Sequence, residues 1–169
     1  MTVPGTFRSA VEAKDLAAVT RALDPGIEFR SPVMVKPYIG RDTVGRLLAV
    51  LFEVFEEFRY TDDLVSRAPN GAGPPTQALI FEARVLGKSV QGLDLLRFGG
   101  TGLVTGLTVM VRPLPAAMTL ARAVGRRMED AANGGAGDAH SPGGSGDSGD
   151  TGDSGGAEGP GGPSGTTRS

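Results

Sequence analysis

The sequence contains no cysteine and only one histidine, which excludes several common kinds of catalytic and metal site. Without cysteine there is no disulfide, no thiol nucleophile and no thiolate metal ligand. The one histidine, His140, lies in a glycine-rich segment near the end of the chain. We therefore expect no histidine-based catalytic triad, no metal site and no cofactor in the folded part of the chain.

Long apolar runs and a strong excess of one charge are also lacking. No apolar stretch is long enough to span a bilayer, and the first residues lack the apolar core of a secretory signal peptide. The formal net charge is only −2, so composition does not favour nucleic acid or an anionic membrane as a partner. The sequence predicts a soluble, cytoplasmic protein with neither kind of partner.

The end of the chain has no large apolar residue. Residues 131–169 include 14 glycines among 39 residues, with no aromatic side chain and no aliphatic one larger than alanine. Such a segment buries too little apolar surface to offset the entropy of ordering it. We therefore predict one folded domain over residues 1–130 and a disordered, acidic, glycine-rich tail over residues 131–169.

Within the predicted domain, helical patterns precede and follow strand patterns. The apolar spacing predicts helices starting near Thr6, Asp15 and Asp42 or Thr43, another from Pro115 to Met128, and strands at 27–29, 58–65 and within 77–114. Sequential antiparallel strands with helices on one face indicate an α+β domain.

The segment 77–114 dominates the predicted sheet. A two-residue loop at Gly87-Lys88 would place Phe81 opposite Asp94 on the next strand. Because side chains alternate between the two faces of a strand, one face is predicted to be apolar. That face holds Leu79, Phe81, Ala83, Val85, Val90, Leu96, Phe98, Leu107, Val109 and Val111. Asp94 is the only acid on it.

Four short motifs occur in an order that resembles a known superfamily. They are the Phe7…Asp15-Leu16 start, the Ile27-Glu28-Phe29…Ser31-Pro32 strand, the Tyr38-Ile39-Gly40-Arg41…Val44 helix start and the Gly92-Leu93-Asp94-Leu95-Leu96-Arg97-Phe98 strand. The set resembles the nuclear transport factor 2-like (NTF2-like) superfamily, within it the SnoaL-like polyketide cyclases and ketosteroid isomerases. The resemblance implies a cone: a curved, mainly antiparallel sheet wrapped by N-terminal helices and a C-terminal helix. This fold hosts enzymes and binding modules alike.

The resemblance also assigns roles to single positions. Ketosteroid isomerases have a tyrosine donor in the first helix, an aspartate base before a strand-ending proline, and a protonated aspartic acid in a later strand. Asp94 matches the last of these groups. Phe7 and Ser31 stand at the positions of the other two, so steroid isomerisation by that mechanism is not expected. SnoaL-like cyclases need little more than a pocket acid.

Two hypotheses of different class follow. In the first, the cone cavity binds a small apolar molecule, and Asp94 is held by Tyr38, Ser31 or a backbone amide. In the alternative, the protein is a SnoaL-like cyclase, isomerase or hydrolase that uses Asp94 as acid/base on a carbonyl-containing substrate, since an apolar site raises the pKa of a carboxyl group. The predicted ligand-binding residues are Ser31, Tyr38, Phe81, Val85, Leu96, Phe98, Leu107 and Val109.

The opposite face of the predicted sheet mixes charged and apolar residues. It holds Glu82, Arg84, Gln91, Arg97, Leu93, Leu95, Val104 and Met110. A solvated sheet face is usually more polar than this. We therefore expect it to join two copies of the chain in a homodimer.

Overall fold

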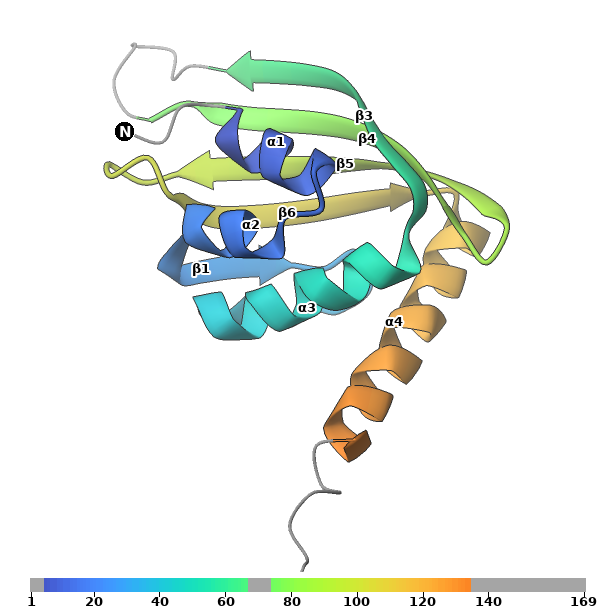
Figure 1. Ribbon diagram of the computed structural model, residues 1–169. Helices are drawn as coiled ribbons and strands as arrows, with labels where there is room; N and C mark the ends of the chain where they lie inside the picture. The colour runs from blue at the N-terminus through green and yellow to red at the C-terminus, as the bar shows by residue number, and fades with distance from the viewer. Residues whose placement is uncertain (1–4, 67–73, 135–169) are drawn as a thin grey trace, which may run out of the picture. The chain divides into compact units, whose positions relative to one another are not determined.

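The computed structural model describes residues 5–66 and 74–134, which form one curved sheet with helices on one side of it (Figure 1). The helices are α1 (Thr6–Glu12), α2 (Leu16–Ala22), α3 (Arg41–Val54) and α4 (Leu114–Gly134), and the strands are β1 (Leu23–Arg30), β2 (Tyr38–Ile39), β3 (Glu56–Ser66), β4 (Thr76–Val85), β5 (Lys88–Phe98) and β6 (Val104–Arg112). The strand order is β2-β1-β6-β5-β4-β3. Pairing is antiparallel except between β1 and β6. The predicted α+β class is confirmed.

The helices begin where local chemistry favours it. The side chain of Asp15 accepts a hydrogen bond from the amide of Ala18 at 2.9 Å and caps α2, as predicted. The start of α3 was predicted wrongly, because Gly40 precedes its first residue and no side chain caps it. Asp42 instead lies in the first turn, where a negative charge suits the helix dipole.

Helix α4 is the last described element, and it packs against α3 and the sheet (Figure 1). Its buried residues include Ala116, Leu120 and Ala123. The helix continues to Gly134, four residues past the predicted domain end. Residues 135–169 of the predicted tail lie outside the described part of the chain.

The loop between β4 and β5 differs from the prediction. It is Leu86-Gly87, and not Gly87-Lys88, with Val85 paired to Lys88. Both loop residues have positive φ, 48° for Leu86 and 76° for Gly87. Positive φ at both positions defines the type I′ turn, whose twist matches that of the strands. The preference for glycine at the first loop position misled the prediction, because here leucine adopts the left-handed conformation.

The register of the sheet moves accordingly by two residues. Phe81 lies opposite Gly92, and Asp94 lies between Leu79 on β4 and Val109 on β6. A two-residue shift preserves the alternation of side chains, so the predicted apolar face is unchanged.

The core lies between this face and helices α1 to α4. Of the ten residues predicted on the apolar face, nine are buried and Val111 is partly buried. Val104, predicted on the outer face, is fully buried. An irregularity in the β5–β6 pairing between Arg97 and Phe98 turns it inward.

Candidate functional site

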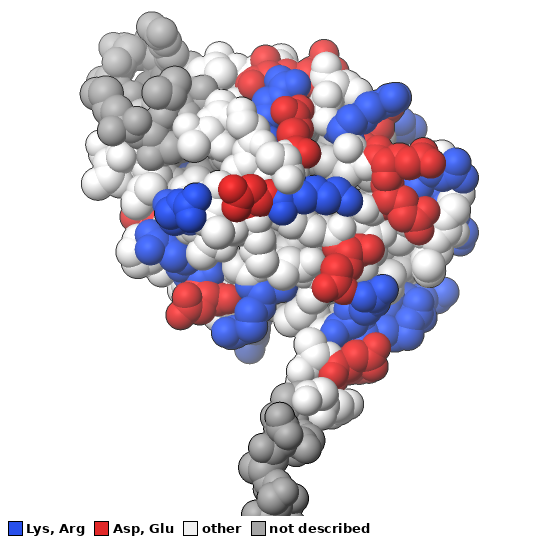
Figure 2. Space-filling model, viewed as in Figure 1, with Lys and Arg blue, Asp and Glu red and all other residues white. Residues whose placement is uncertain are grey.

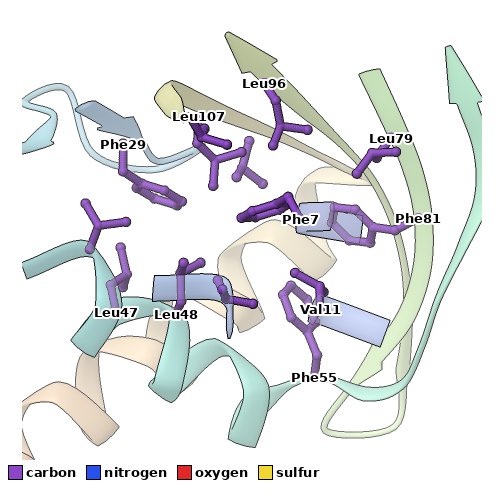
Figure 3. Close-up of a cluster of buried hydrophobic side chains, with 14 of the residues drawn as sticks. Phe7, Val11, Phe29, Leu47, Leu48, Phe55, Leu79, Phe81, Leu96 and Leu107 are labelled. Carbon is purple, nitrogen blue, oxygen red and sulfur yellow. The ribbon is translucent and has the colours of Figure 1, made fainter. Parts of the chain in front are cut away.

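A cavity of about 240 Å³ lies within the core, between the sheet and the helices. Most of its lining is apolar and comes from α1, β1, α3, β3 to β6 and α4. Figure 3 shows Phe7, Phe81, Val11 and Phe55 converging between helix and sheet. The polar or charged residues of the described lining are Glu12, Lys14, Ser31, Tyr38, Tyr60 and Asp94.

Asp94 and Tyr60 form the buried polar pair of this cavity. The Tyr60 hydroxyl donates a hydrogen bond to Oδ2 of Asp94 at 2.7 Å. Asp94 is 9% exposed and Tyr60 7% exposed. Within the described residues, Oδ1 of Asp94 has no hydrogen-bond partner. This oxygen is therefore the one available to a molecule in the cavity.

Burial sets the proton equilibria of the pair. Loss of water around Asp94 raises the pKa of its carboxyl group from 3.8 to about 7, against the opposing effect of the Tyr60 hydrogen bond. Burial also raises the pKa of Tyr60 well above its usual value, and the negative charge of Asp94 adds to this. Tyr60 thus remains a donor near neutral pH, where Asp94 exchanges its proton.

The sheet explains how the two side chains meet. Tyr60 is paired with Phe81, which is paired with Gly92, two residues before Asp94 on β5. The hydrogen bond therefore joins β3 to β5 across β4. Glycine at position 92 leaves room for the Phe81 ring between the two strands. A Cβ there would lie 2.1 Å from Cζ of Phe81 and 2.8 Å from the carbonyl oxygen of Met110.

Aromatic packing holds Tyr60 in place. Its ring centroid lies 4.9 Å from that of Phe58, edge to face. Phe58 lies 5.1 Å from Phe81, and Phe81 lies 5.6 Å from Phe55. Such offset and edge contacts are favourable beyond their buried area. The phenol is thus fixed with its hydroxyl toward Asp94.

The partner of Asp94 is not one of those predicted. Tyr38 instead packs edge-on against Phe29, with ring centroids 6.1 Å apart. The hydroxyl oxygen of Ser31 accepts a hydrogen bond from the Val33 amide at 3.2 Å. Tyr60 was not predicted as a residue of the site. The available signal was the alternation Phe58-Arg59-Tyr60, which places the two rings on one face of a strand.

The predicted ligand-binding residues divide into two groups. Ser31, Tyr38, Phe81, Leu107 and Val109 line the cavity together with Asp94. The other three, Val85, Leu96 and Phe98, are buried but lie outside the cavity lining. They lie toward the ends of β4 and β5, where the residues of the apolar face pack in the hydrophobic core.

Three observations on the described part of the chain concern metal ions, membranes and charged partners. It contains no cluster of histidine, cysteine or acidic residues suited to a metal ion. No helix among residues 5–66 and 74–134 is long and apolar enough to cross a membrane. On the face in Figure 2, positive and negative side chains are interspersed, so no extended field of one sign is available there to steer a charged partner.

Comparison with known proteins places the fold. No protein-family model matches the chain, and no curated protein does. A steroid delta-isomerase from Pseudomonas aeruginosa is 32% identical with a TM-score of 0.68, and the match covers 75% of this chain and 89% of the isomerase. A Silicibacter pomeroyi protein with a cystatin-like fold is 26% identical, also with a TM-score of 0.68, over 76% of this chain and 86% of that one. A SnoaL-like protein from Burkholderia thailandensis shares the fold at 20% identity and a TM-score of 0.51, over 64% of this chain and 90% of its own.

The curved six-stranded sheet, the helices on one side and the enclosed cavity define a cone-shaped α+β domain. The chain belongs to the NTF2-like, SnoaL-like superfamily, as its identity to the steroid delta-isomerase shows.

Proposed function

We propose that this domain binds a small apolar molecule that carries one carbonyl group, with that group against Asp94. The observation that carries the proposal is a mainly apolar cavity with one buried polar pair in its wall. Binding pockets typically combine an apolar lining with a few placed polar groups. The volume of about 240 Å³ lies below the usual range of roughly 300–1,000 Å³, so the ligand is compact.

The free oxygen of Asp94 determines the kind of polar group. Below pH 7 the carboxyl group holds a proton, because its pKa is about 7. With Oδ2 accepting from Tyr60, the proton on Oδ1 is available to donate to a carbonyl oxygen. A neutral donor costs less to bury than an ionised one. A ketone or aldehyde therefore suits the cavity at neutral and slightly acidic pH.

A matched pair of ligands tests the proposal. 2-Acetylnaphthalene and 2-ethylnaphthalene have similar size and shape, but only the first has a carbonyl oxygen. Isothermal titration at pH 6 should show tighter binding of the ketone by about 5- to 10-fold, the contribution of one buried hydrogen bond. Equal affinities would contradict a role for Asp94, and no binding of either compound would contradict an apolar ligand of this size.

A second candidate is catalysis, favoured by the pKa of about 7 and by the similarity to a steroid delta-isomerase. The Asp94 carboxyl would give its proton to a carbonyl oxygen while a base takes a proton from the adjacent carbon, forming an enol. The other carboxylate in the described lining is Glu12, which pairs with Arg8. Exchange of the methyl protons of 2-acetylnaphthalene in heavy water tests this candidate. The wild type should accelerate this proton exchange, and Asp94→Asn should not.

We also propose a homodimer through the outer face of the sheet, in the cytoplasm. The register places two rows of residues across that face: Leu64–Ala78–Leu95–Thr108 and Asp62–Ile80–Leu93–Met110. Leu64 is 54% exposed and Met110 53% exposed. Exposed apolar residues in adjoining rows support an interface, and the absence of cysteine suits a reducing compartment.

A further inference from the structure

We propose that Arg8, on α1, is a positioning residue for the Asp94–Tyr60 pair, so that charges at the domain surface act on the cavity acid through the Tyr60 ring. The inference deepens the proposed function and rests on it only where ligand affinity is concerned. Its effect on Asp94 itself is measurable without any ligand.

The contact between Arg8 and Tyr60 is direct. The guanidinium carbon of Arg8 lies over the Tyr60 ring, 6.0 Å from its centroid. A cation over an aromatic face is attracted by the ring electrons. A positive charge near a phenol also makes its O–H a stronger donor, and this O–H donates to Asp94 at 2.7 Å. The guanidinium group of Arg8 therefore contacts Asp94 indirectly, through the side chain of Tyr60.

Two carboxylates fix Arg8 in this position. Its Nε lies 3.1 Å from Oε1 of Glu12, one turn later on α1, and its Nη1 lies 3.4 Å from Oδ2 of Asp63 on β3. The Arg8 side chain is 31% exposed. The ion pair with Asp63 ties α1 to the strand that carries Tyr60.

A buried glutamine completes the arrangement. Gln77 is 1% exposed and donates from Nε2 to Oδ1 of Asp63 at 2.8 Å. Among the described residues, its own Oε1 has no hydrogen-bond partner. Burying an unsatisfied oxygen is unfavourable, and an apolar residue there would avoid it. A role in orienting Asp63 explains why a glutamine is buried here. Gln77 holds Oδ1 of that carboxylate, and Oδ2 is left to pair with Arg8.

The charges around the pair act in opposite directions. Glu12 raises the pKa of Tyr60 and Arg8 lowers it. Within the described cavity lining, the charged residues are Glu12, Lys14 and Asp94. Neutralising Arg8 weakens Tyr60 as a donor and so raises the pKa of Asp94. Neutralising Glu12 removes a negative charge that offsets the positive charge of Arg8. Tyr60 then becomes a stronger donor, and the pKa of Asp94 falls.

The test is the titration of the Asp94 side-chain carboxyl carbon, followed by NMR in the full chain. Arg8→Met, which keeps the unbranched stem, should raise the pKa of Asp94 by roughly 0.3–1 unit. Glu12→Gln should lower it, and Arg8→Lys should restore part of the wild-type value. Arg21→Met removes a positive charge from α2 and serves as the control, with no shift expected.

A second comparison tests the route through the ring. In a Tyr60→Phe background, the effect of Arg8→Met should fall to less than half, because the donor that carries it is gone. Shifts of the same sign for Arg8→Met and Glu12→Gln would overturn the proposal, since that is the result of a loosened α1. An undiminished Arg8→Met effect without the Tyr60 hydroxyl would also overturn it. Neither outcome bears on whether the cavity binds a ketone.

Discussion

Tyr60 donates a 2.7 Å hydrogen bond to Asp94 across an intervening strand, inside an otherwise mainly apolar cavity. The phenol satisfies one carboxyl oxygen of Asp94, and among the described residues the other oxygen has no hydrogen-bond partner. Burial raises the pKa of Asp94 to about 7, so this second oxygen is a donor or an acceptor according to pH. The pair thus gives the cone a polar contact whose character changes near neutrality.

Asp94→Asn tests this proton equilibrium through stability. The folded state holds a proton that the unfolded state releases near pH 4. The stabilisation from that proton is fully present below the unfolded pKa and is lost as pH rises through about 7. Its full size is about 4 kcal/mol, from a pKa difference of about three units. Asparagine does not titrate, so the variant should gain stability relative to wild type between pH 4 and 8.

The measurement is the free energy of urea unfolding for both proteins at pH 5 and pH 8. A stability difference between the two proteins that stays constant from pH 5 to pH 8 would contradict the raised pKa, because a carboxyl group with an ordinary or depressed pKa is ionised in both the folded and the unfolded state over this range.

Gly92→Ala should destabilise the domain, because a Cβ there would lie 2.1 Å from the ring of Phe81. Overpacking of this kind costs about 1–3 kcal/mol. Gly125→Ala is the control, since a Cβ at that helical position meets nothing within 4 Å and alanine favours a helix by up to about 1 kcal/mol. Unfolding free energies should move in opposite directions. An unchanged stability for Gly92→Ala would show that Phe81 moves freely.

Particular residues explain which features of the fold and of the site were predictable from the sequence. The apolar face was predictable because alternation depends only on whether a residue number is odd or even, and a two-residue slip preserves it. The register was not predictable, because it depends on a left-handed Leu86. Tyr60 escaped notice because its contact with Asp94 spans a strand and joins residues far apart in the chain.

The residues that border the cavity could not be predicted from local sequence patterns either. Phe81 and Leu96 share a face and a pattern of burial, yet only Phe81 borders the cavity. Which buried residues meet empty space depends on sheet curvature and on the helices that cover it. Neither is encoded in the period of a single strand.

Leu95→Lys should convert the proposed dimer into monomers, because it places an unpaired charge in an apolar row of the outer face. Light scattering gives the mass directly. Leu86→Lys, in the β4–β5 turn and 61% exposed, should leave the mass unchanged. A wild type that is already monomeric at high concentration would end the dimer proposal.

Deleting residues 135–169 should leave the thermal midpoint almost unchanged, since that segment has no aromatic residue and no aliphatic one larger than alanine. Deleting from Leu120 onward removes buried residues of α4 and should lower the midpoint by many degrees. A large drop for the shorter deletion would show that the tail packs on the domain.

The affinity for 2-acetylnaphthalene as a function of pH shows whether the Asp94 carboxyl group donates its proton to a bound carbonyl oxygen. In the wild type, affinity should fall by about 5- to 10-fold as pH rises from 6 to 8.5, because Asp94 loses the proton that it donates to the carbonyl oxygen. In Asp94→Asn, the amide remains a donor at every pH, so affinity should stay constant. A wild-type affinity that is flat or rises with pH, or the same pH dependence in Asp94→Asn, would contradict proton donation by Asp94.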